Sequence, residues 1–133
     1  MPLSARVVTP EREVWAGDAS MVIARGVEGE VGILAGHAPM LVRLAVGPLR
    51  IHRDEGEIRA VVDGGFLHVT TEGDRTRVDV LATEAELSDE IDLEAARRSK
   101  SELEARLAQR RDDADAEAGL ARANARLALL ESR

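Results

Sequence analysis

The clearest sign of the architecture is the segment Glu28-Gly29-Glu30-Val31-Gly32-Ile33-Leu34-Ala35-Gly36-His37-Ala38-Pro39. It surrounds a short apolar run with three glycines, a proline, two acids and a histidine. Glycine allows positive φ or close backbone approach, which we expect at Gly29, Gly32 and Gly36. Proline favours an extended residue before it and cannot donate to a strand ladder. We therefore expect a strand at 31–34 between two turns. Because no common catalytic motif has this pattern, the segment is interpreted as a contact surface.

Most of the first 82 residues have the pattern of short strands. Leu49 and Ile51 alternate with polar neighbours, and alternation recurs at 57–62 and 77–80, with Val61 on the side expected to face water. Glycine and acidic residues interrupt these runs, so hairpin turns are expected at 54–56, 63–65 and 72–74. Many short strands without a helical pattern between them predict an antiparallel β-sandwich or flattened barrel.

After Leu87 the glycines nearly vanish, and alanine, leucine, glutamate and arginine dominate. Ser88 or Asp92 is expected to cap a first helix, and the aspartates of Arg110-Arg111-Asp112-Asp113 to cap a second. Apolar residues recur at helical spacing in two stripes: Leu93, Ala96, Leu103 and Leu107, then Ala116, Leu120, Ala123, Leu127 and Leu130. Two stripes joined by a short polar turn predict an antiparallel αα-hairpin.

The expected seam between the two helices is narrow, because it mixes leucines with small alanines and Lys100. A fully buried leucine contributes roughly 1.5–3 kcal/mol and alanine far less. Ordering the backbone costs about 1–2 kcal/mol per residue, which consumes most of that gain. We therefore expect the hairpin to be near balance between docked and undocked forms, and bistable packing of this kind can act as a switch.

The composition excludes several classes of function. A net charge of −7 argues against nucleic-acid binding, which needs a basic patch, and an aromatic content of 2% provides no stacking platform for bases. The absence of cysteine excludes disulfides and thiolate metal sites and favours a cytosolic compartment. No apolar run approaches the roughly 20 residues of a membrane span. The first residues also lack the pattern of a signal peptide. Membrane association is therefore expected only through partner proteins.

Neither a metal site nor an active site is expected. His37, His52 and His68 are scattered, and their spacing does not resemble a pair of zinc ligands. Ser4 and Ser20 have no evident histidine partner for nucleophilic catalysis. The glycines of 63–65 do not form a phosphate-binding motif. We expect no catalytic residues and no cofactor.

Three segments together carry a resemblance to a known family. Segment 28–39 is followed by Gly47-Pro48-Leu49-Arg50-Ile51 and by Asp63-Gly64-Gly65-Phe66-Leu67. In this order and spacing they resemble the epsilon subunit of the F-type ATP synthase, and the helical tail extends the resemblance to nearly the whole chain. One departure is Ala35, which stands where most members carry proline and leaves the loop less constrained. The resemblance implies a β-sandwich domain at 1–86 and a regulatory helical hairpin at 87–133.

The resemblance also implies partners and a location. In this family the β-domain binds the gamma subunit and the ring of c subunits, at the cytoplasmic face of the bacterial plasma membrane. The helices are compact in one state; in another they extend toward the alpha and beta subunits and obstruct ATP hydrolysis. Carried over to this chain, the contacts to the c ring are expected at Glu28, Gly29 and Glu30. The gamma interface, or the positioning of its loop, is expected at Gly32, Gly36, His37 and Pro39.

Nucleotide binding is the main alternative. Some bacterial relatives bind ATP between the helices through Ile-Asp-x-x-Arg-Ala, but this chain reads Ile91-Asp92-Leu93-Glu94-Ala95-Ala96 and lacks the arginine. The residues that could bind a nucleotide are Asp92, Arg98, Arg122 and Arg126. The arginines are equally interpreted as solvated side chains paired with glutamates one turn away. The missing arginine argues against an ATP sensor, and a β-sandwich adaptor for some other partner is a third alternative.

Overall fold

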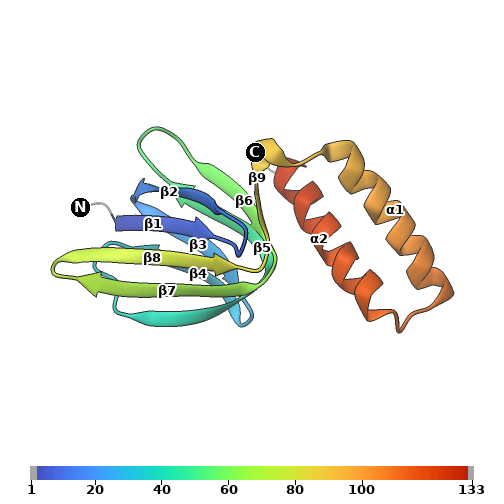
Figure 1. Ribbon diagram of the computed structural model, residues 1–133, viewed down its shortest axis with the longest axis horizontal. Helices are drawn as coiled ribbons and strands as arrows, with labels where there is room; N and C mark the ends of the chain where they lie inside the picture. Colours follow the sequence, from blue (N-terminus) through green and yellow to red (C-terminus); the bar gives the residue numbers. More distant parts are fainter. Residues whose placement is uncertain (1–2, 132–133) are drawn as a thin grey trace.

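A computed structural model describes residues 3–131, so the outermost residues of the two expected domains, 1–2 and 132–133, lie outside it (Figure 1). Nine strands come first in this part of the chain: β1 (Leu3–Val8), β2 (Glu13–Ala19), β3 (Met21–Gly26), β4 (Gly29–Leu34), β5 (Met40–His52), β6 (Ile58–Val62), β7 (Gly65–Glu72), β8 (Arg75–Ala82) and β9 (Ala85–Leu87). They form what we call the β-domain. A 3₁₀ turn, η1 (Ser88–Glu90), leads to helices α1 (Leu93–Gln109) and α2 (Ala114–Glu131).

The strands form the two layers of a sandwich, and the long strand β5 belongs to both. Its first residues pair with β7 in the layer β2-β1-β8-β7, and its last residues pair with β3 and β6 in the layer that includes β4 and β9. The expected antiparallel sandwich is confirmed, with one difference: β1 pairs with β8 in parallel. These two strands are joined by no hairpin, so no turn dictates their relative direction.

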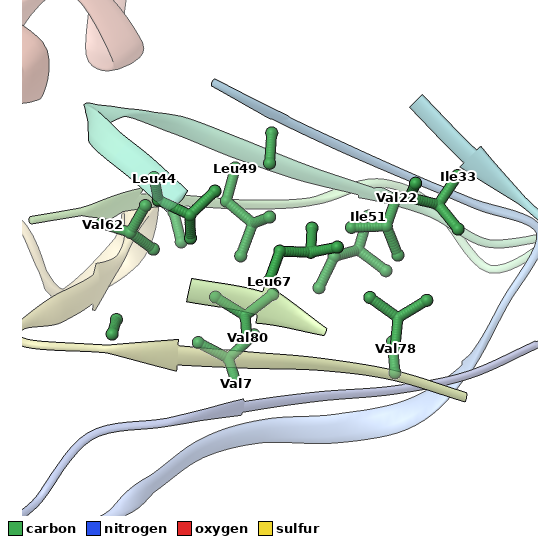
Figure 2. Packing of buried hydrophobic residues seen from close by; sticks show 14 of the residues in the cluster. Val7, Val22, Ile33, Leu44, Leu49, Ile51, Val62, Leu67, Val78 and Val80 are labelled. Atoms are coloured by element: carbon green, nitrogen blue, oxygen red, sulfur yellow. The ribbon is translucent and has the colours of Figure 1, made fainter. Parts of the chain in front are cut away.

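The core lies between the layers. Leu67, Val78 and Val80 of one layer face Leu49 and Ile51 of the other (Figure 2), and all five side chains are buried. They occupy alternate positions of their strands, as the period-two pattern predicts. Because each such side chain contributes roughly 1.5–3 kcal/mol when fully buried, this apolar layer is the main source of stability of the β-domain.

The turns agree with the sequence in two cases and correct it in a third. Hairpins close at 54–56 between β5 and β6 and at 72–74 between β7 and β8, as expected. The turn at 63–65 is not a hairpin, because β6 pairs with β5 and β9 whereas β7 pairs with β5 and β8. It carries the chain from one layer to the other. Gly65 has φ +104°, and a Cβ there would lie 2.1 Å from the carbonyl oxygen of Leu81, so only glycine fits.

The two helices form the expected antiparallel hairpin. The side chain of Asp92 caps α1 by accepting a hydrogen bond from the Ala95 amide at 3.0 Å. Asp113 caps α2 through the Ala116 amide, also at 3.0 Å, and accepts from Arg106 at 2.8 Å. The Ala116 amide and then the Arg106 guanidinium hold the pKa of Asp113 below its ordinary value. These contacts fix the turn between the helices from both sides.

The hairpin lies against one end of the β-domain chiefly through α2, which contacts β5 and β6, with α1 on the outer side (Figure 1). Leu129 of α2 is 2% exposed, and Val61 of β6 is 4% exposed. The sequence interpretation placed Val61 toward water and left Leu129 outside the apolar stripe. Both placements are wrong. Helix α2 covers the outer face of β6, and it does so with a face other than the predicted apolar stripe. Arg59 donates a hydrogen bond to the Leu129 carbonyl across this contact.

Candidate protein-interaction surfaces

The β3–β4 turn brings together the three residues expected at the c ring. Glu28 is exposed at the tip of the turn, and Gly29 follows it with φ +135°, a conformation that favours glycine. Glu30 is exposed on β4, opposite Arg25 of β3. The two carboxylates therefore extend from one end of a hairpin into solvent.

This turn is fixed to β5 by a residue that the sequence interpretation missed. A Cβ at Gly26 would lie 2.9 Å from Val42 Cγ1 and 3.0 Å from the carbonyl oxygen of Gly29, so the glycine allows close packing. The next residue, Val27, donates its amide to the Arg43 carbonyl at 2.9 Å. No local sequence signal reveals this approach, because Val42 is 16 residues away in a strand that pairs with β3.

The loop at 35–39 is anchored to β8. Gly36 has φ +90°, and its amide donates to the hydroxyl of the buried Thr76 at 2.6 Å. His37 donates its amide to the Leu34 carbonyl at 3.1 Å, and its Nδ1 lies 2.7 Å from the Ala38 carbonyl oxygen. The loop is therefore held by one tertiary hydrogen bond, to Thr76, and by local contacts of His37, without a proline at position 35. The sequence does not indicate that Thr76 anchors this loop, because its partner Gly36 is 40 residues away.

Gly32 and Pro39 complete the expected gamma surface. Pro39 is exposed immediately before β5. Gly32 differs from the expectation, since it is an ordinary residue of β4 without positive φ, and a Cβ there would lie 4.0 Å from its nearest neighbour, Met21 Sδ. It requires neither special backbone conformation nor close approach. Because Gly32 has no side chain, the backbone is exposed on the outer face of β4 between Glu30 and Leu34.

An exposed apolar patch continues from this loop across the outer face of one layer. We call Leu41, Phe66 and Leu81 the sheet-face patch; their exposed fractions are 65%, 45% and 45%. Phe66 pairs directly with Leu81 on β8 and, on its other side, with Arg43 of β5. Leu41 pairs with His68, two positions along β7 from Phe66, so all three side chains lie on one face of the sheet, with Leu41 diagonal to Phe66. Such clusters of large exposed hydrophobic residues are typical of protein-docking sites.

The sequence interpretation included Phe66 in a motif but missed Leu41 and Leu81. Leu81 carried a usable signal: in β8 the residues Val78, Val80 and Ala82 point inward, so the intervening leucine points to solvent. An apolar residue at an outward position of a regular alternation is a sign of a contact surface. Leu41 carried no comparable sign, because it lies within the apolar run Met40-Leu41-Val42, where the sequence does not alternate.

A groove of about 380 Å³ separates α2 from the β-domain. Arg122 contacts Asp63 at 3.3 Å, and Arg126 contacts Glu86 at 2.5 Å. Neither arginine pairs with a helix glutamate one turn away, so that interpretation is wrong for these two residues. The charged residues that line the groove are four acids and three arginines: Glu11, Asp63, Glu84, Glu86, Arg12, Arg122 and Arg126. Their balance does not favour an anion.

The other two nucleotide candidates lie elsewhere. Asp92 uses its carboxylate as the cap of α1, and Arg98 lies on the exposed side of that helix. Neither is among the described residues that line the groove. The structure thus brings Arg122 and Arg126 together and leaves Asp92 and Arg98 apart from them.

Other kinds of site have little support among the described residues. Within residues 3–131, no group of three or more His, Asp or Glu side chains is arranged to hold a metal ion. His52, one of the scattered histidines, instead lies 3.0 Å from Glu57. Across the same residues, neither helix combines the length and the apolar character that a membrane crossing requires.

Comparisons with known proteins agree with this geometry. The family model of the ATP synthase delta/epsilon chain β-sandwich domain matches residues 2–88. This chain belongs to the ATP synthase epsilon chain family. It is 48% identical to the epsilon chain of Thermobifida fusca over 94% of its own length and 89% of the relative's. With the epsilon chain of Brevibacillus brevis it shares 43% identity, over 85% of this chain and 83% of that one.

A solved structure resembles the whole molecule. A chain of the mitochondrial ATP synthase of Euglena gracilis, determined as an OSCP/F1/c-ring assembly, superposes with a TM-score of 0.71. The identity is 27%, over 98% of this chain and 78% of that one. Like other epsilon chains, this one is a non-catalytic subunit of ATP synthase, which explains why its notable features are contact surfaces.

Proposed function

We propose that this epsilon chain is a rotor subunit in the central stalk of a proton-translocating ATP synthase. Its β-domain couples the gamma subunit to the c ring during ATP synthesis, and its helices restrain ATP hydrolysis when they extend toward the alpha and beta subunits. The similarity to a chain solved within an F1/c-ring assembly supports this placement. The bacterial relatives support a peripheral location, at the cytoplasmic face of the plasma membrane and through the complex.

The sheet-face patch is the observation that carries the proposal. It is apolar, exposed and contiguous, and it begins two residues after Pro39, the last residue of the expected gamma surface. We therefore assign the gamma interface to the loop at 35–39 together with Leu41, Phe66 and Leu81. A rigid sandwich transmits torque well, because its interior is closely packed and deforms little.

The β3–β4 turn is assigned to the c ring. It presents Glu28 and Glu30 on a hairpin end that is fixed to β5 through Gly26 and Val27. Acidic side chains on a short, well-supported turn suit the polar loops of a ring, because exposed charges give specificity without a large apolar contact. The turn is hydrogen-bonded to Arg43, which pairs with Phe66, so the two proposed contacts lie near each other but on opposite sides of β5.

Co-purification with the gamma subunit tests the assignment. We expect the double variant Phe66→Asp with Leu81→Asp to lower recovery with gamma at least about tenfold, since a tenfold change requires only about 1.4 kcal/mol. The matched control is Ala118→Asp, a charge added at an exposed position near the start of α2. Undiminished, stoichiometric recovery of a folded double variant would refute the assignment of gamma to this patch.

Nucleotide sensing remains the alternative function, and the arrangement of charges gives it little support. A phosphate at Arg122 and Arg126 has to displace the carboxylates of Asp63 and Glu86. We expect isothermal titration of the full chain with ATP to give no saturable heat at submillimolar nucleotide. Saturable heat that disappears in the variant Arg126→Ala would instead favour the sensor.

A further inference from the structure

The contact between the helical hairpin and the β-domain combines ion pairs with a small apolar centre. The residues of α2 that reach the β-domain, Arg122, Arg126 and Leu129, are spaced by four and three positions and so share one helix face. Leu129 supplies the deeply buried apolar side chain of this face, and Val61 supplies its counterpart on β6. The two arginines bind Asp63 and Glu86 on either side of that small apolar contact.

A third ion pair fixes the hinge between the two parts. Arg12, in the β1–β2 loop, contacts Glu90 of η1 at 2.8 Å. The same Glu90 carboxylate accepts the Leu87 amide at 2.9 Å, so it stabilises the turn that begins the linker. Thr9 holds Arg12 in place, because the Thr9 amide donates to the Arg12 carbonyl at 2.9 Å. The hydrogen bond from Arg12 also holds the pKa of Glu90 below its ordinary value.

We propose that these three pairs, Arg122–Asp63, Arg126–Glu86 and Arg12–Glu90, form an electrostatic latch from which the hairpin is released as an intact unit. According to this proposal, the three ion pairs hold the hairpin against the β-domain in the compact form, and they must break before the two helices separate. It deepens the braking role and rests on the proposed function for its physiological meaning. Docking itself, however, is a property of the isolated chain.

The physical basis is that salt acts differently on the two contacts of α2. The side chains of the latch are between 21% and 47% exposed, so ions in solution reach them and screen their attraction. The helical hairpin instead buries the apolar side chains of Ala96, Ala116, Ala123 and Leu127 and packs Leu103 of α1 closely against Gly119 of α2, and apolar burial is not weakened by salt. Rising ionic strength should therefore undock the hairpin before it separates the helices.

A distance measurement on the full chain tests this. The natural sequence has no cysteine, so spin labels can be attached at Asp74→Cys in the β7–β8 turn and Ser101→Cys in α1, both exposed sites. The docked chain should give one narrow distance distribution at about 0.05 M salt. At about 1 M salt, where the screening length falls to about 3 Å, the ratio of undocked to docked chains should rise about tenfold. The helical circular dichroism signal should stay constant.

Charge reversal provides the decisive variants. The double variant Asp63→Lys with Glu86→Lys should give the broad, undocked distribution already at low salt. Adding Arg122→Asp and Arg126→Asp should restore the narrow one. The control Glu94→Lys reverses an ion pair of similar type, Arg97–Glu94 at 3.2 Å within α1, and should change nothing.

Three results would overturn the latch. These are a narrow distribution in the wild type at high salt, a docked Asp63→Lys/Glu86→Lys variant, and a loss of helical signal in step with release. Because no partner is present, such a failure would leave the central-stalk assignment standing. Conversely, failure to bind gamma would leave the latch standing.

Discussion

The β-domain and the helical hairpin differ in the amount of apolar surface that stabilises them. The β-domain buries a contiguous cluster drawn from all nine strands, with leucines, isoleucines and valines at its centre. In the helices the buried residues are three alanines and two leucines: Ala96, Ala116, Ala123, Leu127 and Leu129. Since burial free energy follows apolar area, the first region is stiff and the second is only moderately held.

This difference matches a division of labour. A part that transmits force needs one arrangement with a large energy gap, whereas a part that changes position needs contacts that a partner can replace. The outward-facing apolar residues of the β-domain add docking surface without weakening the core beneath, because alternate strand positions face opposite sides. In the hairpin the ion pairs to Asp63 and Glu86 take the place of a second core.

The largest expected effect is a cavity in the sandwich. Leu67 is fully buried between the layers, so Leu67→Ala should lower the free energy of unfolding by about 2–5 kcal/mol. The matched variant Leu107→Ala, at a half-buried position of α1, should cost clearly less. Urea denaturation followed by circular dichroism measures both. Equal losses would mean that the two regions do not differ as their burial indicates.

A smaller effect is expected when the hairpin is removed. Truncation after Leu87 exposes Val61 and should cost the β-domain only about 1–2 kcal/mol, leaving it folded and able to assemble. ATP hydrolysis by the assembled enzyme should then rise, because in the proposed function the helices restrain it. Thermal unfolding of the truncated chain and ATPase assays of the complex check the two parts. A truncated chain that no longer assembles would show that the hairpin supports the β-domain rather than regulating the enzyme.

The sequence predicts well what depends on local pattern. The alternation around Leu49 and Ile51, the caps Asp92 and Asp113 and the exposed turn at Glu28 all agree with the structure. In each case the signal lies within a few residues, where strand period, capping and turn chemistry act directly.

What the sequence did not reveal depends on residues far apart in the chain. The parallel pairing of β1 with β8, the burial of Val61 beneath α2 and the hold of Thr76 on Gly36 all join segments separated by 40 or more positions. Arg122 and Arg126 show the consequence for function. Their helical spacing was compatible with exposure to solvent, with binding of a nucleotide or with ion pairs to carboxylates of the β-domain. Only the folded structure shows that they pair with Asp63 and Glu86.

The smallest expected effect is a pH dependence of stability that arises in the turn between the two helices and not in the β-domain. Asp113 has a pKa below its ordinary value in the folded chain, because its carboxylate accepts the Ala116 amide and the Arg106 guanidinium. Its contribution is therefore present above the pKa of the unfolded chain and is lost as the pH falls through the lower pKa of the folded chain.

The variant Asp113→Asn keeps a side-chain cap and removes this titration. At pH 7 it should lower the midpoint of helix melting by a few degrees, and the difference from wild type should shrink toward zero in acid, as Asp113 becomes protonated in the folded chain. Helical circular dichroism during thermal unfolding at several pH values measures the change. The control Asp112→Asn alters a neighbouring carboxylate that is 82% exposed and is paired with Arg110, so its effect should be slight at every pH. If the difference between Asp113→Asn and wild type persisted unchanged in acid, the charge on Asp113 would not be what stabilises the turn. The contrast between a sandwich held by apolar burial and a hairpin held partly by charges would then be weaker.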